Sequence, residues 1–122
     1  MNPEVKAKWL EALRSGEYNQ TKRTLRDSHG YCCLGVLCEV YKEEHPEAEW
    51  VRDDISTKNG EMLFKSGEYS RKGVPTQQVL DWANLTDANP EVKYNNADIS
   101  VAELNDNGKS FLEIADIIEE HL

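Results

Sequence analysis

Apolar residues near the start of the chain recur every three or four positions, which is the period of a helix. Asn2 and Pro3 form a typical N-cap and first-turn pair, and Gly16 follows the last apolar residue. The apolar stripe consists of Val5, Trp9, Ala12 and Leu13. We therefore expect a helix from Pro3 to Ser15.

The other end of the chain carries two helix-start signals in tandem. The segments Ser100 to Glu103 and Ser110 to Glu113 both read Ser-x-x-Glu, the pattern of a capping box, and the turn pair Asn107-Gly108 separates them. This predicts a short helix, a tight turn and a longer final helix. The stripe expected to face the core in that final helix is Phe111, Ile114, Ala115, Ile118 and Leu122.

The segment from Tyr31 to Glu44 is apolar on nearly every side for its first ten residues and then becomes charged before Pro46. This pattern predicts a central helix whose first half is buried all round. A buried strand is the alternative for that first half. Gly35 costs about 1 kcal/mol relative to alanine inside a helix, so we expect another backbone to approach it closely.

Shorter signals lie on either side of this segment. Residues 17–30 are polar and predict an ordered loop or a short strand, closed by a turn at Asp27-Ser28-His29-Gly30. Residues 49–74 hold two apolar runs on either side of the turn pair Asn59-Gly60, which predicts a short hairpin.

A further helix is expected after this hairpin. Pro75 and Thr76 open an apolar stripe that fades by Asn84. For residues 86–98 the sequence predicts a loop, in which Val92 to Tyr94 could form one short strand.

Together these elements predict an α+β fold, a mainly helical single domain over residues 1–122 with a buried central helix and a small β-hairpin. Apolar residues make up 39% of the chain and charged residues 30%, which favours a modest core and a polar surface. No apolar run approaches the length of a membrane helix, and no signal peptide is evident. We therefore expect a cytoplasmic protein that does not bind membranes.

The net charge of −9 is unevenly spread along the chain. Residues 1–30 hold six Lys and Arg against four Asp and Glu, whereas residues 31–122 hold eight against nineteen. This acidic bulk argues against duplex nucleic acid as a partner, because its phosphates need a basic face. The acidic surface either keeps the protein soluble or mimics nucleic acid and binds a basic protein.

Three cysteines, Cys32, Cys33 and Cys38, lie close together, and their odd number fits a reducing compartment. The cysteines, taken together with His29 and His45, lack the spacing of a zinc site. A Cys-His nucleophile pair is supported only by the proximity of His29 in the sequence. Buried cysteines that act as small apolar residues account for all three. We predict no metal, no cofactor and no catalytic residue.

Cationic side chains gather in one polar loop of this otherwise acidic chain. Guanidinium and ammonium groups bind phosphate oxygens, and a neighbouring aromatic ring can stack on a base. The predicted ligand-binding residues are Tyr18, Gln20, Lys22, Arg23, Arg26 and His29. The alternative is a solvated loop that pairs with acidic helices of the same domain.

Three sequence blocks resemble a small protein family that is common in bacteriophage and prophage genomes. They are W-L-E-A-L-R-S-G-E-Y-N-Q (Trp9 to Gln20), L-R-D-S-H-G-Y-C-C-L-G-V-L-C (Leu25 to Cys38) and L-N-D-N-G-K-S-F-L-E-I-A (Leu104 to Ala115). The resemblance implies no activity and no site residue. It implies a context: an accessory product that acts in the host cytosol by blocking a host protein or sequestering a defence signal.

The preferred functional hypothesis is a phage-type accessory protein, active in counter-defence, that sequesters an anionic small molecule such as a nucleotide immune signal without catalysis. The alternative is an acidic protein-protein inhibitor or nucleic-acid mimic that blocks a host protein. Association with a second copy of the chain is compatible with either hypothesis.

Overall fold

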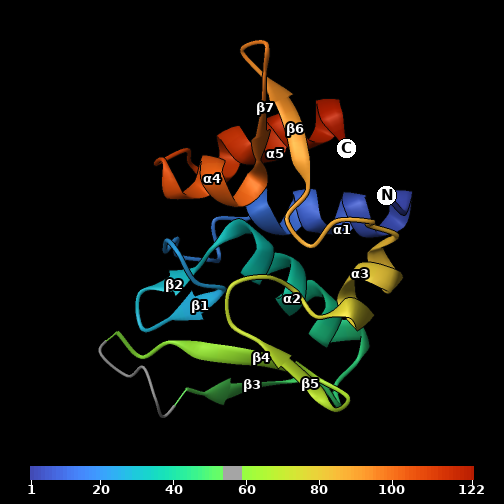
Figure 1. The fold of residues 1–122 in the computed structure, drawn as a ribbon, viewed down its shortest axis with the longest axis vertical. Coiled ribbons are helices and arrows are strands. Elements are labelled where there is room, and N and C mark those ends of the chain that lie inside the picture. The colour runs from blue at the N-terminus through green and yellow to red at the C-terminus, as the bar shows by residue number, and fades with distance from the viewer. Residues whose placement is uncertain (54–58) are drawn as a thin grey trace.

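The computed structural model describes residues 1–53 and 59–122, and these residues form an α+β fold (Figure 1). The helices are α1 (Pro3–Arg14), α2 (Cys33–Glu44), α3 (Gln77–Ala83), α4 (Val101–Asp106) and α5 (Phe111–His121). The strands are β1 (Arg26–Asp27), β2 (Gly30–Tyr31), β3 (Glu49–Arg52), β4 (Met62–Ser66), β5 (Tyr69–Arg71), β6 (Glu91–Tyr94) and β7 (Ala97–Ser100). The α+β part of the predicted fold class is therefore confirmed.

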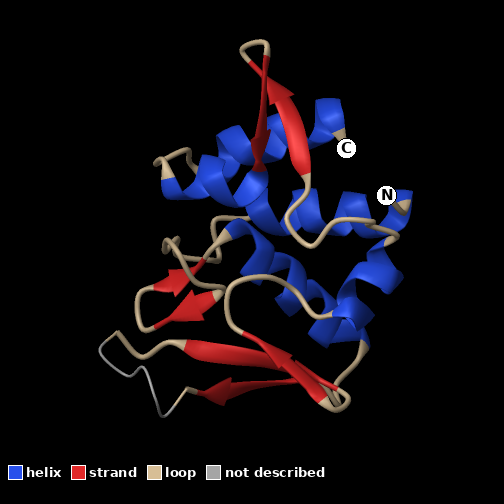
Figure 2. Ribbon diagram, viewed as in Figure 1, coloured by secondary structure: helices blue, strands red, loops and turns tan. Residues whose placement is uncertain are grey.

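The elements are stacked along the long axis of the molecule (Figures 1 and 2). Strands β1 to β5 form an antiparallel sheet at one end, with β4 bonded to β1, β3 and β5. Helix α2 lies between this sheet and α1, and α1 packs in turn on α5. The separate hairpin of β6 and β7 projects at the opposite end, next to α4 and α5.

Helix α1 forms as the sequence predicts. The side chain of Asn2 accepts hydrogen bonds from the amides of Glu4 and Val5 at 2.9 and 3.3 Å, so it caps the helix. Trp9 is fully buried, and its indole N–H donates to the Cys33 carbonyl at 2.9 Å. This bond fixes α1 against the start of α2.

Helix α2 begins at Cys33, two residues later than predicted, because Tyr31 belongs to β2 and Cys32 serves as the N-cap. The strand alternative for the first half of this helix is wrong. A Cβ added to Gly35 would lie only 1.9 Å from the Leu25 carbonyl oxygen, so the expected close approach of another backbone is confirmed. Every residue from Cys33 to Cys38 is buried.

The hairpin predicted within residues 49–74 is present as β3 and β4, with Trp50 opposite Phe64 and Arg52 opposite Met62. Its connection is longer than a two-residue turn at Asn59-Gly60, and residues 54–58 of it lie outside the described residues. Strand β5 was not predicted from the sequence. It pairs with β4 and places Ser66 opposite Tyr69.

A second hairpin replaces most of the loop expected over residues 86–98. The possible strand at Val92 to Tyr94 is present as β6, and β7 pairs with it through a turn at Asn95 and Asn96. Both asparagines have positive φ, at 51° and 65°, as the two central residues of a type I′ turn require. The expectation of a loop was wrong here because asparagine alone is a weaker signal for this turn than Asn-Gly.

The C-terminal helices follow the two capping signals. Ser100 caps α4 by accepting from the Glu103 amide at 3.1 Å, and Ser110 forms a complete capping box with Glu113. Phe111, like the apolar residues of α5 that follow it on the same face, is buried in the core shared by all five helices. None of the helices in the described ranges is long and apolar enough to cross a membrane.

Candidate functional site

Four of the six predicted ligand-binding residues line one open groove beside the loop that joins α1 to β1. This basic groove has a volume of about 650 Å³. Its lining consists of Gln20, Thr21, Lys22, Arg23, Asp27, His29, Asn59 and Glu61. The structure therefore brings Gln20, Lys22, Arg23 and His29 together, and it places Tyr18 and Arg26 elsewhere.

Lys22 and Arg23 supply the positive charge of the basic groove. Both side chains are exposed, and neither forms an ion pair with any residue in the described ranges. The backbone of Arg23 is left-handed, with φ of 68°, a conformation that costs a non-glycine residue about 1 kcal/mol. Its amide donates to Asp106 Oδ1 at 2.8 Å, so α4 holds this turn in place.

Gln20 fixes the start of the same turn through its side-chain amide. Its Nε2 donates to Asn105 Oδ1 and to the Lys109 carbonyl, each at 2.8 Å. Asn105 is completely buried, and its Nδ2 donates to the Thr21 carbonyl at 2.7 Å. Gln20 therefore serves mainly to anchor the turn beside the groove, because its side-chain Nε2 already donates two hydrogen bonds within the protein.

His29 lies at the tip of the β1–β2 turn, at the rim of the basic groove. Its backbone amide donates to Asp27 Oδ1 at 2.8 Å, and its exposed ring stands 3.7 Å from the same oxygen. The Thr21 hydroxyl donates to Asp27 Oδ2 at 2.9 Å, which engages the second carboxylate oxygen. Asp27 therefore organises the turn, and the ring of His29 faces solvent.

Arg26 has a different environment from Lys22 and Arg23. Its guanidinium carbon lies 4.8 Å from the centre of the Tyr31 ring and 5.5 Å from that of Trp50. Such cation–π contacts position the guanidinium over the sheet, away from the groove.

Tyr18 lines a second hollow, between α1 and α2. Its ring meets Tyr31 edge to face, with centres 5.2 Å apart. Burial, followed by the charges of Glu43 and Glu39, raises the pKa of the Tyr18 hydroxyl to about 12. The base-stacking role predicted for this ring requires a ligand that reaches beyond the basic groove.

The three cysteines are buried thiols. Cys32 Sγ accepts from the Gly35 amide at 3.4 Å, and Cys33 Sγ donates to the Val101 carbonyl at 3.4 Å. Burial raises the pKa of Cys32 to about 11 and the pKa values of Cys33 and Cys38 well above the ordinary value. The thiols therefore stay protonated at neutral pH, which opposes nucleophilic or metal-binding roles. Within the described residues, no three His, Cys, Asp or Glu side chains converge as metal ligands would.

Sequence reasoning did not find Asn105 and Asp106, which hold the groove from α4. A signal was present: Asn105 follows Leu104 on the apolar side of a short capped helix, where a polar side chain has to find buried partners. The pairing of these residues with a loop some eighty positions earlier had no signal in the sequence.

The fold and the basic groove define a small α+β domain whose cationic turn is held by buried amide contacts. The chain belongs to the family described as Domain of unknown function (DUF8296), whose model matches residues 1–122. No curated protein and no solved structure matches the chain.

Proposed function

We propose that the protein binds an anionic small molecule through the turn at Lys22 and Arg23, and sequesters it without changing it chemically. The observation that carries this proposal is the placement of two exposed cations, without ion-pair partners among the described residues, on one groove of an acidic protein. A guanidinium and an ammonium group in this arrangement suit phosphate oxygens.

The held backbone at Arg23 supports the same proposal. The left-handed backbone of Arg23 is held by the Asp106 carboxylate, which accepts from its amide, and by Asn105, which donates to the carbonyl of Thr21. Strain of this kind gathers at sites where the chain is pre-organised for a ligand. A turn that is fixed before binding loses less conformational entropy when the ligand arrives.

The charges that line the groove also restrict the class of ligand that it can bind. Its lining includes Asp27 and Glu61 as well as the cations, and Lys72 pairs with Glu61 at 3.2 Å. The phosphates of duplex nucleic acid would be repelled by these carboxylates and by the acidic bulk of the chain. A compact phosphate-bearing molecule is small enough to contact Lys22 and Arg23 without lying against the other acidic residues. A mononucleotide or a cyclic nucleotide is therefore the ligand class we favour.

The proposed biological role is that of a phage-type counter-defence protein in the host cytosol that removes a nucleotide immune signal. The three sequence blocks that resemble phage and prophage proteins support this role. They meet in the structure: Trp9 donates to the carbonyl of Cys33, and Gln20 donates to Asn105. The resemblance therefore includes Gln20 and Asn105, which hold the turn beside the groove.

The proposal is tested by calorimetry and thermal shift of the purified protein with inorganic phosphate, ATP and a panel of cyclic mono- and dinucleotides. For any compound that binds in this screen, we expect Lys22→Ala and Arg23→Ala each to weaken binding by about 1.5–3 kcal/mol, the contribution of a charge-assisted hydrogen bond. Added salt should reduce the affinity moderately.

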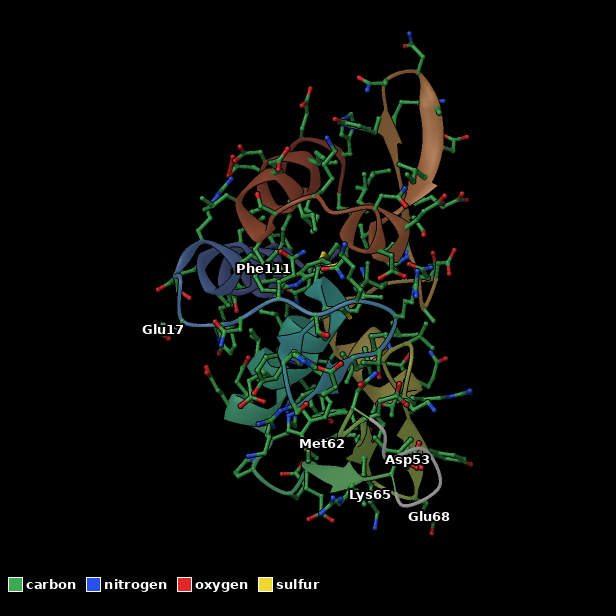
Figure 3. The ribbon with its side chains drawn as sticks, turned by 90° about the vertical axis from the view of Figure 1, so that its left-hand side faces the viewer. Glu17, Asp53, Met62, Lys65, Glu68 and Phe111 are labelled. Atoms are coloured by element: carbon green, nitrogen blue, oxygen red, sulfur yellow. The ribbon has the colours of Figure 1, made fainter. Side chains whose placement is uncertain are left out.

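The matched control is Lys65→Ala, which removes an exposed cation on β4, a strand that contributes no residue to the groove (Figure 3). If Lys65→Ala weakens binding as much as Arg23→Ala does, the attraction is non-specific. Absence of binding for every nucleotide at millimolar concentration would contradict the proposal.

A further inference from the structure

Three half-buried aromatic rings form a continuous strip on the surface between α1 and β3. Tyr18 meets Tyr31 at 5.2 Å and 87°, and Tyr31 meets Trp50 at 5.9 Å and 73°. The guanidinium of Arg26 lies over the second and third rings. We name Tyr18, Tyr31, Trp50 and Arg26 the aromatic strip.

The half-buried strip is held in place by its neighbours. The Trp50 indole N–H donates to Glu39 Oε2 at 2.7 Å, and its ring packs on the buried ring of Phe64 at 4.9 Å. Tyr, Trp and Arg are the residues that most often carry the binding energy of protein interfaces, because they offer large contact areas with few rotatable bonds. The composition of the strip therefore matches a protein-binding surface.

The strip ends at Tyr18 in a hollow of about 330 Å³ between α1 and α2. Carboxylates of Glu11, Glu17 and Glu43 line this acidic hollow, and Ala12 and Val40 contribute apolar surface. Figure 3 shows Glu17 at the edge of the molecule, on the loop that leaves α1. None of the three carboxylates has an ion-pair partner within residues 1–53 and 59–122. Lys8 also lines the hollow, and it pairs with Glu44 at 3.2 Å.

We infer that the aromatic strip and the acidic hollow form one docking surface for a partner protein that presents a basic segment, with an arginine or lysine seated in the hollow against the ring of Tyr18. Charge complementarity selects the partner: three carboxylates without ion-pair partners among the described residues lie around an aromatic ring that attracts cations, and the one ammonium group that lines the hollow, that of Lys8, is paired with Glu44. The length of the strip, which continues past the hollow to Trp50, selects a protein segment over a small organic cation.

The docking surface is separate from the basic groove. The hollow and the strip share no residue with the groove lining, and the cations Lys22 and Arg23 of the groove have no counterpart among the three carboxylates of the hollow. Phosphate compounds should therefore neither compete with the basic segment nor depend on Glu43, and loss of one site leaves the other intact.

The test is an NMR titration of the ¹⁵N-labelled protein with an acetylated penta-arginine peptide, its penta-citrulline analogue and free arginine amide. We expect the arginine peptide to shift the amides of residues 11–18 and the indole N–H of Trp50, and the citrulline peptide to leave them in place. Glu43→Gln and Tyr18→Leu should each raise the dissociation constant about tenfold, and Tyr18→Phe, which keeps the ring, should preserve binding.

Glu68→Gln is the matched control, since Glu68 is an exposed carboxylate in the β4–β5 turn, far from Glu17 in Figure 3. A loss of affinity in Glu68→Gln equal to that in Glu43→Gln would show diffuse attraction to the net charge and overturn the inference. Equal affinity for free arginine amide and the peptide would overturn the assignment to a protein partner. Thermal unfolding of each variant reports whether it is folded.

Discussion

Gln20 and Asn105 lie 85 positions apart in the sequence and are joined by a 2.8 Å hydrogen bond from Gln20 Nε2 to Asn105 Oδ1. The same oxygen accepts from the Cys33 amide at 3.2 Å, and Asn105 Nδ2 donates to the Thr21 carbonyl. One buried amide therefore links the basic loop, the start of α2 and the end of α4. The structure of the basic groove depends on this junction.

Asn105→Leu should destabilise the protein by about 3 kcal/mol or more, because it removes the hydrogen-bond partner of the Cys33 backbone amide and of the Thr21 carbonyl. Urea unfolding measures this loss. Asn107→Ala, in the exposed turn two residues later, should change the stability by less than about 0.5 kcal/mol. Equal effects of the two substitutions would show that the junction is not a major source of stability.

Gly35→Ala should cost about 3 kcal/mol or more, because the new methyl group would lie 1.9 Å from the Leu25 carbonyl oxygen and backbone would have to move. Gly73→Ala offers a control, since a Cβ there meets nothing within 4 Å. Thermal unfolding of both variants tests the contact. A Gly35→Ala protein as stable as Gly73→Ala would mean that α2 shifts freely against Leu25.

Arg23→Gly should separate backbone strain from ligand binding. Glycine adopts the left-handed conformation without the side-chain penalty, so the variant should be more stable than the wild type by up to about 1 kcal/mol, and Arg23→Ala should not be. Both should lose affinity for any nucleotide found to bind the wild type. Equal stability of the two variants would indicate that the Asp106 contact already removes the strain.

The buried thiols should make the folded state less stable at alkaline pH. The folded-state pKa of Cys32 is raised to about 11 from an ordinary value of 9.0, so its stabilising effect is complete below pH 9 and is lost as the pH rises through 11. In urea unfolding between pH 9 and 11, Cys32→Ala should flatten the fall in stability by up to about 1.4 kcal/mol per pH unit. An unchanged slope would contradict burial of this thiol.

The sequence by itself determined the helices and several of their ends. The period of the apolar residues and the side-chain caps at Asn2, Ser100 and Ser110 are local features whose effect needs few distant partners. The hairpin of β3 and β4 was also predictable, because two apolar runs flank turn residues. The sequence likewise revealed that cations gather between residues 20 and 29.

Only the tertiary structure decided which of those cations share a groove. Lys22 and Arg23 remain exposed, whereas Arg26 is drawn over Tyr31 and Trp50 by contacts that depend on the pairing of β1 with β4. Strands β5 and β7 are short and weak in intrinsic preference, so their partners make them strands. The position of Asn105 beneath the loop depends on the packing of α4 against α2, because a hydrogen bond between distant residues exists only once the chain between them has folded.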